Sequence, residues 1–566
     1  MTSTSLGGTK ELATNTEPEK NISKSDNLPC AKASAQMLET PTSWRPSPPE
    51  LPDVSEMDFL MGTVSATLKL MDTPATMFDK LSPDPSPSPV PRHDPVQYGP
   101  FIRALTTDPL LEISKEAAAE LIQQWCDGVG MLYPIIDRQK MLDTAHGVLT
   151  TLRYVQDNGV ALHRGALMET LFNEETNKLK LILAISRTME CGPEDKTARR
   201  LFQSITEVVD SLVLNLTSIG RLQILLLAAL YYYHIDEEVI SGRIVGLAAR
   251  LCLEIGLHRR PALEASFPNP DKRLAALRTL WSIYMLERRI SLGQLMPFMI
   301  QDACVDPSLF ATLNHHTQQC TPSIPSHLRG GSSLALSSFL DLAKLSGKTW
   351  QALVNHGETS SELRVENLSY LDYQVAQWYG KLPGDLTLNH FLLRQCDQQH
   401  TRIYIQAVLF FQNCQLRNAI HGQILQSATF TNQNEAHVQT AAQIAKNTIQ
   451  TLADLNEKTP FVRNHPIFFK YPLLTALSNL LTAAARSGPE TSKAEIGIAL
   501  SLFELLSMRS RQVMRIWQRL EGIQALQALL YSSTPDERSV GAITPPEHSP
   551  PEPFPLEVLL DLYPLV

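Results

Sequence analysis

The amino-acid sequence predicts an all-α protein: a large multi-helix domain with proline-rich ends. Apolar residues recur at helical spacing through most of the chain between about residues 110 and 530. Alternation of apolar and polar residues, which half-buried strands require, is nearly absent. Prolines gather at the two ends, with 15 of the 38 in the first 100 residues and eight between Pro535 and Pro564. Because proline interrupts helix and sheet hydrogen bonding, the folded domain is expected between these ends.

The chain is expected to consist of three segments. Residues 1–100 are predicted to be a disordered Pro/Ser-rich region, and Leu81–Pro95 within it has the composition of an extended, polyproline-like linker. Residues 105–532 are predicted to form the all-α domain. Residues 533–566 are predicted to be a disordered tail and a candidate activation segment.

The helices are predicted from the spacing of apolar residues, in chain order. The first spans Glu112–Cys126, and Ser114 is its candidate N-cap because a serine hydroxyl can accept a hydrogen bond from a first-turn N–H. A polar loop at Asn314–Ser333 divides the later helices into two groups. The further predicted helical segments are Leu179–Thr188, Ala198–Leu214, Ile219–Tyr233, Leu334–Val354, Asp397–Leu425, Glu435–Leu455, Tyr471–Ala485 and Thr491–Leu530.

The most informative stretch is Ile244–Leu309, which contains two further helices. In the first, one apolar face is formed by Val245, Ala248, Ala249, Cys252 and Ile255. Gly256 stands where a left-handed residue ends a helix, Leu257 is placed to fold back on the last turn, and Pro261 blocks continuation.

In the second helix of this stretch, the apolar face is formed by Leu274, Leu277, Trp281 and Tyr284. Arg288 continues this line, so a cation is expected in the interior. Glu287 lies beside it and is the expected partner, because a buried charge needs one.

These residues resemble the middle homology region of fungal zinc-cluster transcription factors. The family pattern is an alanine-rich helix ending in Glu-Ile-Gly-Leu-His-Arg, then Arg-x-x-x-Trp-x-x-Tyr-x-x-Asp-Arg, then Ser-x-x-x-Gly-Arg-Pro and an acidic stretch ending near a proline. Arg278 lies near the second block, and Tyr133–Asp137 resembles the start of the domain. The matching positions are Glu254, Ile255, Gly256, Leu257, His258, Arg259, Trp281, Tyr284, Met285, Leu286, Arg288, Ser291, Gly293, Pro297, Asp302, Asp306 and Pro307.

Three departures from the family pattern matter. Glu287 replaces the usual aspartate, no second tryptophan follows Trp281, and Gln294 stands where an arginine usually follows the glycine. The resemblance implies an all-α regulatory domain in a transcriptional regulator or coregulator of a fungal nucleus. Such regulators often control metabolic gene clusters, including those of secondary metabolism.

The cysteines do not provide the family's DNA-binding module, a two-zinc cluster held by six thiolates at CxxC-type spacing. Only Cys30 precedes Cys126, and no run of Lys and Arg accompanies it. We therefore interpret the chain as a member of the family without the zinc cluster, or as a gene model that lacks its first exon. The resemblance then implies recruitment to DNA through a partner, either another DNA-binding transcription factor or a coactivator, in a homodimer or heterodimer.

Composition agrees with an intracellular regulator. The formal net charge of −9 argues against a surface built mainly to bind DNA phosphates. The eight cysteines are scattered, which is typical of reduced thiols and not of a disulfide framework. The longest apolar run, Ile224–Tyr233, is too short to span a bilayer, so no membrane association is expected.

Several polar clusters are candidate sites, but none is predicted to have a catalytic, cofactor-binding or metal-ligating role. His315, His316 and Cys320 have loose metal-ligand spacing, and a polar loop is the favoured interpretation. The acidic residues after His234 are expected to be solvated at a helix end. His258–Arg260 are expected to lie near the carbonyls of a helix C-terminus. The pairs Arg199–Arg200 and Arg288–Arg289 are expected to be surface residues or ion-pair partners.

The C-terminal segment Pro551–Val566 mixes acidic residues with large apolar ones. Leu556, Leu559, Leu560 and Tyr563 share a helical face, and Glu557 and Asp561 lie between them in the sequence. This composition favours either docking on a coactivator groove or packing on the protein's own core. The alternatives to a regulator are an all-α enzyme, such as one that ionises diphosphates, and a helical scaffold. No aspartate-rich metal motif supports the enzyme.

Overall fold

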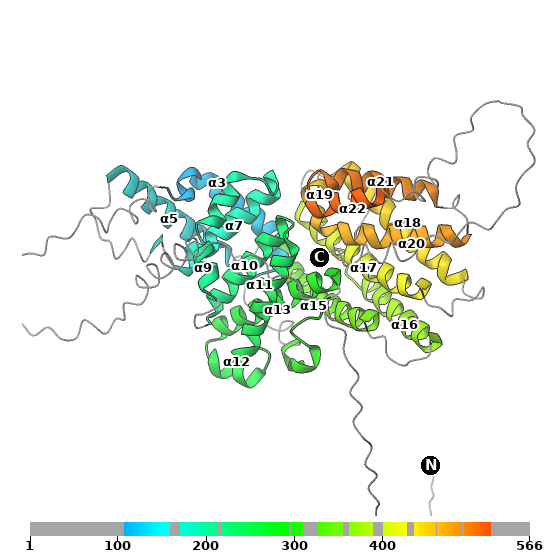
Figure 1. Cartoon of the computed structure of the whole chain (residues 1–566). Coiled ribbons are helices and arrows are strands. Elements are labelled where there is room, and N and C mark those ends of the chain that lie inside the picture. The colour runs from blue at the N-terminus through cyan, green and yellow to red at the C-terminus, as the bar shows by residue number, and fades with distance from the viewer. Residues whose placement is uncertain are drawn as a thin grey trace, which may run out of the picture. The chain divides into compact units, whose positions relative to one another are not determined.

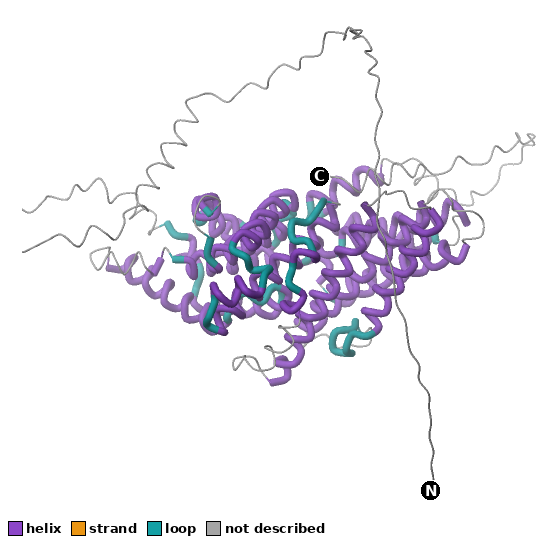
Figure 2. The backbone as a smooth tube through the Cα atoms, turned by 90° about the horizontal axis from the view of Figure 1, so that it is seen from below, coloured by secondary structure: helices purple, strands orange, loops and turns teal. Residues whose placement is uncertain are grey.

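The computed structural model divides the chain into two units, Met1–Arg92 and His93–Val566. All residues that the structure describes belong to the second unit. They are residues 107–158, 170–171, 173–212, 217–294, 296–310, 326–354, 361–388, 400–426, 435–459, 461–487 and 492–521. Within these ranges the chain forms helices, turns and loops and no β-strand, which confirms the predicted all-α class (Figure 2).

The first group of helices lies between residues 109 and 304 (Figure 1). In chain order they are η3 (Pro109–Glu112), α3 (Lys115–Asp127), α4 (Val129–Leu132), α5 (Arg138–Asn158), α7 (Glu174–Cys191), α8 (Lys196–Gln203), α9 (Thr206–Ser211), α10 (Ile219–His234), α11 (Glu238–Glu254), α12 (Arg260–Ser266), α13 (Pro270–Gln294) and η4 (Asp302–Cys304). Helix α10 packs against α7 and α11, and α11 packs in turn against α13.

The second group lies between residues 326 and 521. In chain order the elements are α15 (Ser326–Val354), α16 (Ser361–Gly380), α17 (His400–Gln426), α18 (Glu435–Lys458), α19 (Phe461–Asn464), η7 (Pro466–Phe468), α20 (Lys470–Ser487), α21 (Lys493–Ser507) and α22 (Arg511–Glu521). Helix α20 packs against α17, α18 and α21, and α15 joins this group to α13.

Helix α10 explains the longest apolar run of the sequence. Every residue from Leu222 to Tyr231 is buried, so the helix is apolar around most of its circumference and lies in the interior. A helix placed in this way needs neighbours on several sides, and α7, α9, α11 and α13 supply them.

Most of the predicted helices are confirmed, including the N-cap of α3. The Ser114 hydroxyl accepts a hydrogen bond from the N–H of Ala117 over 3.0 Å. Two predicted helices are interrupted. The segment Ala198–Leu214 turns at residues 204–205, between α8 and α9, and Thr491–Leu530 turns at residues 508–510, between α21 and α22. Apolar spacing continues through both turns, so the pattern did not mark them.

The sequence missed other elements. Helices α5 and α16 were not predicted. In α16, the large side chains of Tyr370 and Tyr373 are 62% and 57% exposed, so apolar residues do not lie on one buried face only. Helix α15 begins at Ser326, inside the predicted polar loop Asn314–Ser333. The prediction of a loop was therefore wrong for residues 326–333. Residues 1–106 and 522–566, which include the predicted terminal segments, lie outside the described residues.

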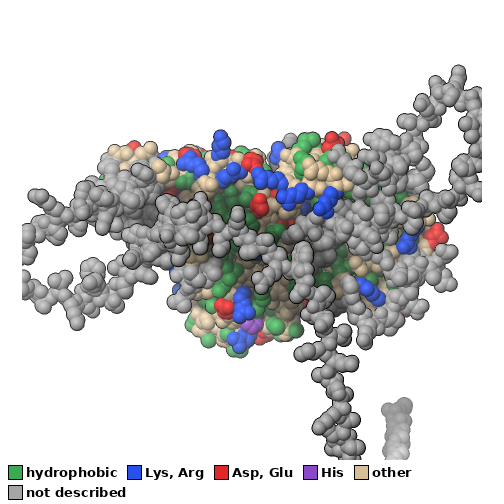
Figure 3. Space-filling model, viewed as in Figure 1, with side chains coloured by type: hydrophobic (Ala, Val, Ile, Leu, Met, Phe, Trp, Pro, Cys, Tyr) green, Lys and Arg blue, Asp and Glu red, His purple; other side chains and the backbone are tan. Residues whose placement is uncertain are grey.

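Charged side chains are unevenly distributed over the surface. Figure 3 shows several Lys and Arg side chains in a row across the upper part of the face seen in Figure 1. This row stands out because the whole chain carries a net charge of −9.

Candidate functional site

The first part of the family-like motif ends α11 as the sequence predicts. Gly256 has a φ of +76°, in the left-handed region. The N–H of Gly256 donates to the carbonyl of Leu253, and the N–H of Leu257 donates to the carbonyl of Cys252. This pair of hydrogen bonds is the Schellman arrangement, and Leu257 is fully buried against the core. Pro261 then occupies the first turn of α12, where its missing N–H costs nothing.

The second part of the motif places Trp281 in the interior of α13. Its side chain is fully buried, as predicted, and stacks on Phe310 with ring centroids 4.6 Å apart. Tyr284 meets Trp281 edge to face at 5.5 Å. However, every residue from Thr279 to Arg288 is buried, so this part of α13 is enclosed on all sides. The sequence predicted that only one face of this helix is buried, whereas this part of α13 is buried on every face.

Arg288 is the buried cation that the sequence predicts, with 1% of its surface exposed. Its ion-pair partner is Asp302, over 2.5 Å, and its guanidinium also donates to the carbonyl of Ile300. The guanidinium lies over the rings of Tyr284 and Phe298, at 3.9 and 4.3 Å from their centroids. The Tyr284 hydroxyl donates to the same Asp302 carboxylate over 2.6 Å.

The predicted partner, Glu287, has a different role. Its carboxylate accepts hydrogen bonds from the backbone N–H groups of Met299 and Ile300. Burial raises the pKa of Glu287 above its ordinary value, although these two N–H groups oppose the rise. The expectation that Glu287 pairs with Arg288 was therefore wrong, because consecutive helix residues point in different directions.

Together these contacts form what we call the α13 clamp: Trp281, Tyr284, Glu287, Arg288 and Asp302. The clamp fastens residues 296–310 onto α13, and the N–H of Asp306 adds a hydrogen bond to the carbonyl of His258. Its one ion pair, between Arg288 and Asp302, lies within the clamp, and the Arg288 Nε has no hydrogen-bond partner among the described residues. The motif that carries the family resemblance thus holds the domain together.

The third part of the motif contacts the second group of helices. A side chain at Gly293 would lie only 2.4 Å from the ring of Tyr471, so glycine permits the close approach of α13 and α20. Gln294, which replaces the usual arginine, is half buried, and its amide nitrogen has no hydrogen-bond partner among the described residues.

A second buried charge cluster, the α11–α20 junction, joins residues far apart in the sequence. Lys470 is 1% exposed and donates to Glu238, which is 2% exposed, over 2.6 Å. The Tyr471 hydroxyl donates to the same Glu238 oxygen over 2.7 Å. Lys470 also donates to the side-chain oxygen of Gln512 and lies 3.9 Å from Asp236.

Asp236 anchors α22 to this junction. It has a φ of +68°, which is uncommon for a residue other than glycine but tolerated by aspartate. Its carboxylate accepts hydrogen bonds from the Ser510 hydroxyl and the Gln512 N–H, each over 2.7 Å. The sequence-based expectation that these acidic residues are solvated at a helix end was therefore wrong for Asp236 and Glu238.

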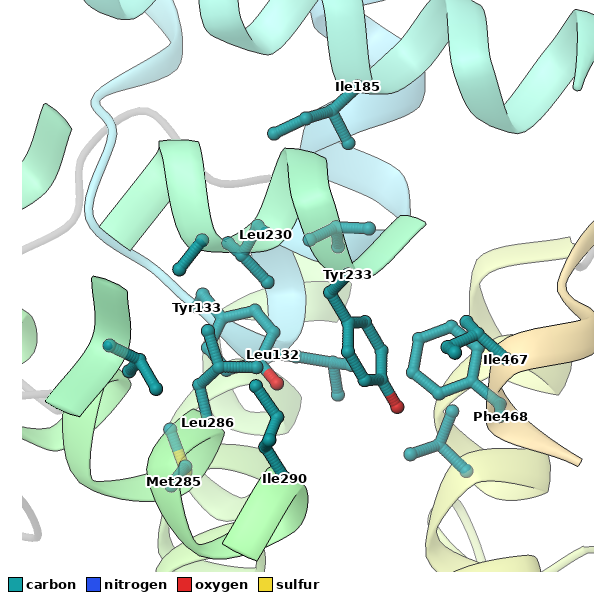
Figure 4. Packing of buried hydrophobic residues seen from close by; sticks show 14 of the residues in the cluster. Leu132, Tyr133, Ile185, Leu230, Tyr233, Met285, Leu286, Ile290, Ile467 and Phe468 are labelled. Carbon is teal, nitrogen blue, oxygen red and sulfur yellow. The ribbon is translucent and has the colours of Figure 1, made fainter. Parts of the chain in front are cut away.

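Two histidines lie beside the junction. Burial lowers the pKa of both His234 and His465 to about 3, so both are neutral. Their rings contact Phe468, which also faces Tyr233 of α10 (Figure 4). They line a small cavity of about 20 Å³, together with Asp236, Arg463 and Arg509. This volume suits a water-sized molecule.

Other predicted residues have structural partners. Arg199 pairs with Glu194 and Arg200 with Glu112, which confirms the interpretation of ion-pair partners. Arg260 pairs with Glu264 one turn along α12, and so belongs to the following helix.

The three consecutive tyrosines of α10 do not form a single aromatic platform. Tyr231 and Tyr232 pack around Phe202, whereas Tyr233 faces Phe468. His315, His316 and Cys320 lie outside the described residues.

Within the described ranges, no group of three or more His, Cys, Asp or Glu side chains is placed to hold a metal ion. The cysteines at positions 126, 191, 252, 304 and 414 are free thiols. No described helix combines the length and the apolar character that crossing a bilayer requires.

Comparison with known proteins identifies the domain. Residues 183–456 match the family model of the fungal specific transcription factor domain. This range contains the α13 clamp and begins inside α7. Searches of curated proteins and of solved structures each found no match.

The chain therefore contains a fungal specific transcription factor domain, an all-α domain whose sequence motif builds the α13 clamp. The presence of this domain supports a role as a fungal transcription regulator. This domain implies a non-enzymatic, nuclear protein that interacts with the transcription machinery.

Proposed function

We propose that the protein is a transcriptional coregulator that reaches its target genes through a DNA-binding partner and controls a metabolic gene cluster. The match of residues 183–456 to the fungal specific transcription factor domain is the observation that carries this proposal. The partner would be another zinc-cluster regulator bound as a heterodimer, or a coactivator complex. The domain would span residues 105–532, with the two ends of the chain outside it.

Recruitment through a partner is supported by charge. A protein that neutralises several DNA phosphates needs clustered cations, and the net charge here is −9. Before Cys126 the sequence contains one cysteine, Cys30, whereas the family's zinc cluster uses six. The protein alone is therefore expected to give no specific gel shift at physiological salt. A shift at nanomolar protein that disappears as salt is raised would contradict recruitment through a partner.

The tail is the proposed contact with the transcription machinery. Phe554, Leu559 and Leu562 are apolar anchors in a segment that Glu557 and Asp561 keep soluble. Burying each such side chain in a partner groove is worth roughly 1.5–3 kcal/mol. Loss of three anchors would therefore weaken coactivator binding by orders of magnitude.

The test is a reporter assay with the full chain fused to a heterologous DNA-binding domain. The triple variant F554A/L559A/L562A is expected to lose most of the activation while its melting temperature stays within about 1 °C of wild type. A matched triple variant of polar residues in the same tail, T544A/H548A/S549A, is expected to keep full activity.

The outcomes separate the proposal from its alternatives. Full activity and unchanged stability in F554A/L559A/L562A would exclude the tail as the contact. A markedly lower melting temperature would indicate that the tail packs on the domain's own core. No activation by the wild-type fusion would favour a repressor or a helical scaffold without a role in transcription.

A further inference from the structure

Helix α16 has two tyrosines on its outer side. The helix packs on α15 and α17, and Figure 1 shows it at the lower edge of the second group. Leu368, Leu371 and Val375 form its buried side. On the opposite side, Tyr370 and Tyr373 have the largest exposed fractions of any aromatic side chain that the structure describes. The contacts within the domain therefore leave these two rings uncovered.

The exposed side chains are held in one arrangement by contacts with each other. The rings of Tyr370 and Tyr373 stack with their centroids 6.5 Å apart and their planes at 23°. Gln377, one turn further along the same side, donates from its amide to the Tyr373 hydroxyl over 2.9 Å. Ordered side chains lose less entropy when a partner covers them. Tyrosine also contributes strongly to protein interfaces, because it combines a large ring with a hydroxyl.

Opposite charges stand at the two ends of this surface. Glu366 precedes Tyr370 by four residues, Lys381 follows Gln377 by four, and both are exposed. The N–H of Lys381 still donates to the carbonyl of Gln377, so Lys381 continues the last turn of the helix. Spacings of three and four residues place all five residues on one side. We call this surface the α16 stripe: Glu366, Tyr370, Tyr373, Gln377 and Lys381.

The α16 stripe is complementary to itself. The midpoint between Glu366 and Lys381 falls between residues 373 and 374, and so does the midpoint between Tyr370 and Gln377. A two-fold axis through this point lays two copies of α16 antiparallel. Glu366 then faces Lys381 of the second copy, and Tyr370 faces Gln377 of the second copy. A two-fold interface brings the same surface of both subunits together, so it requires this kind of symmetry in charge.

We propose that two copies of the protein associate through the α16 stripe, with their α16 helices antiparallel. The stripe is about 22 Å long and a helix is about 10 Å wide, so each copy buries roughly 200–300 Å² there. Stable complexes bury about 800 Å² per partner, and this dimer is therefore expected to be weak. The proposal does not depend on the coregulator role proposed above, because it concerns a contact between two copies of this chain.

Charge reversal in the full-length protein tests the contact. Sedimentation velocity would measure association from about 5 to 200 µM, which suits a small interface. E366K and K381E each place like charges together at both ends of the two-fold contact. Each variant is expected to weaken association about tenfold, because two exposed ion pairs are replaced by two repulsions.

Two combinations restore the opposite charges. The double variant E366K/K381E has the net charge of wild type and is expected to recover wild-type association. An equimolar mixture of E366K and K381E is expected to associate more tightly than either variant alone. Loss of association in the single variants without recovery in either combination would overturn the proposal, because the charges would then act on something other than a second copy.

The tyrosines are tested separately. Y370A/Y373A is expected to weaken association at least tenfold, whereas its melting temperature should change little because both side chains are exposed. The control M508A removes an exposed apolar side chain outside the stripe and should associate as wild type does. The proposal is overturned if the wild-type protein is monomeric over the whole concentration range. It is also overturned if E366K and K381E associate as strongly as wild type, since another surface would then form the contact.

Discussion

The α13 clamp and the α11–α20 junction each bury a cation, but they do so in different ways. Arg288 and Lys470 are both 1% exposed. The partner of Arg288, Asp302, lies 14 residues away and its side chain is 41% exposed. The partner of Lys470, Glu238, lies 232 residues away and is 2% exposed. The clamp is thus a local, partly hydrated device, whereas the junction is a fully buried link between the two groups of helices.

This difference shows what each region does for the domain. The clamp holds residues 296–310 on α13, the helix that precedes them. Its contacts therefore join residues that are close together in the sequence. The junction exists only when α11, α20 and α22 have come together, since Lys470, Asp236 and Gln512 converge there. A substitution in the junction is therefore expected to affect assembly of the whole domain. A substitution in the clamp is expected to affect the integrity of α13.

The largest effect is expected from Trp281 in the clamp. Trp281→Ala removes a fully buried ring that stacks on Phe310, and we expect it to cost about 3–5 kcal/mol of unfolding free energy. Urea denaturation measures this loss, and little soluble protein is the expected phenotype in cells. Trp281→Phe, which keeps a ring in place, should cost less. Wild-type melting of the alanine variant would mean that Trp281 is a surface residue.

Breaking the junction is expected to cost nearly as much. Lys470→Met leaves the buried Glu238 carboxylate without its cation, a change worth about 3–5 kcal/mol. Calorimetry or urea denaturation measures it. The double variant K470M/E238Q also removes the orphaned charge and should recover most of the stability. If the double variant is no more stable than K470M alone, the loss comes from packing and not from the uncompensated charge.

Breaking the clamp's ion pair is expected to cost less than breaking the junction. In Arg288→Met, Asp302 remains accessible to water, so we expect a loss of about 1.5–3 kcal/mol, typical of hydrogen bonds to charged groups. Arg288→Lys should recover only part, because an ammonium cannot bind Asp302 and the Ile300 carbonyl as a planar fork. If Arg288→Met lowers the unfolding free energy as much as Lys470→Met does, the clamp and the junction do not differ in how they stabilise a buried cation.

The smallest effect is the change in stability that the two histidines beside the junction cause between about pH 7 and pH 6. His234 and His465 have folded pKa values of about 3, below the ordinary 6.5, so the unfolded chain binds protons that the folded one does not. Their contribution to stability is complete above pH 6.5 and is lost as pH falls toward 3. Between about pH 7 and pH 6 each histidine should cost about 0.7 kcal/mol.

The control for this pH dependence is a variant without one of the imidazoles. His465→Gln should lower the slope of stability against pH by about half, whereas Trp281→Phe, which removes no titrating group, should leave the slope unchanged. Equal slopes for wild type and His465→Gln would show that the buried imidazole does not titrate as its burial implies.

Local features were predictable from the sequence where all the residues that cause them lie in one short segment. The stop at Gly256 and Leu257, the N-cap Ser114 and the burial of Trp281 all follow from residues within a few turns of each other. The turn at Ser510 was not predictable in the same way, because it depends on the Asp236 carboxylate, 274 residues away.

By itself, the sequence determined the all-α class, the positions of most helices and the motif that identifies the domain. Apolar periodicity specifies which side of a helix is buried, and short-range motifs specify how the helix ends. Only the tertiary structure decided that Arg288 pairs with Asp302 and not with Glu287, and that Glu238 and Asp236 meet Lys470 instead of water. The physical reason is that periodicity encodes burial but not the partner, and a buried charge is paired by whichever distant helix the packing brings to it.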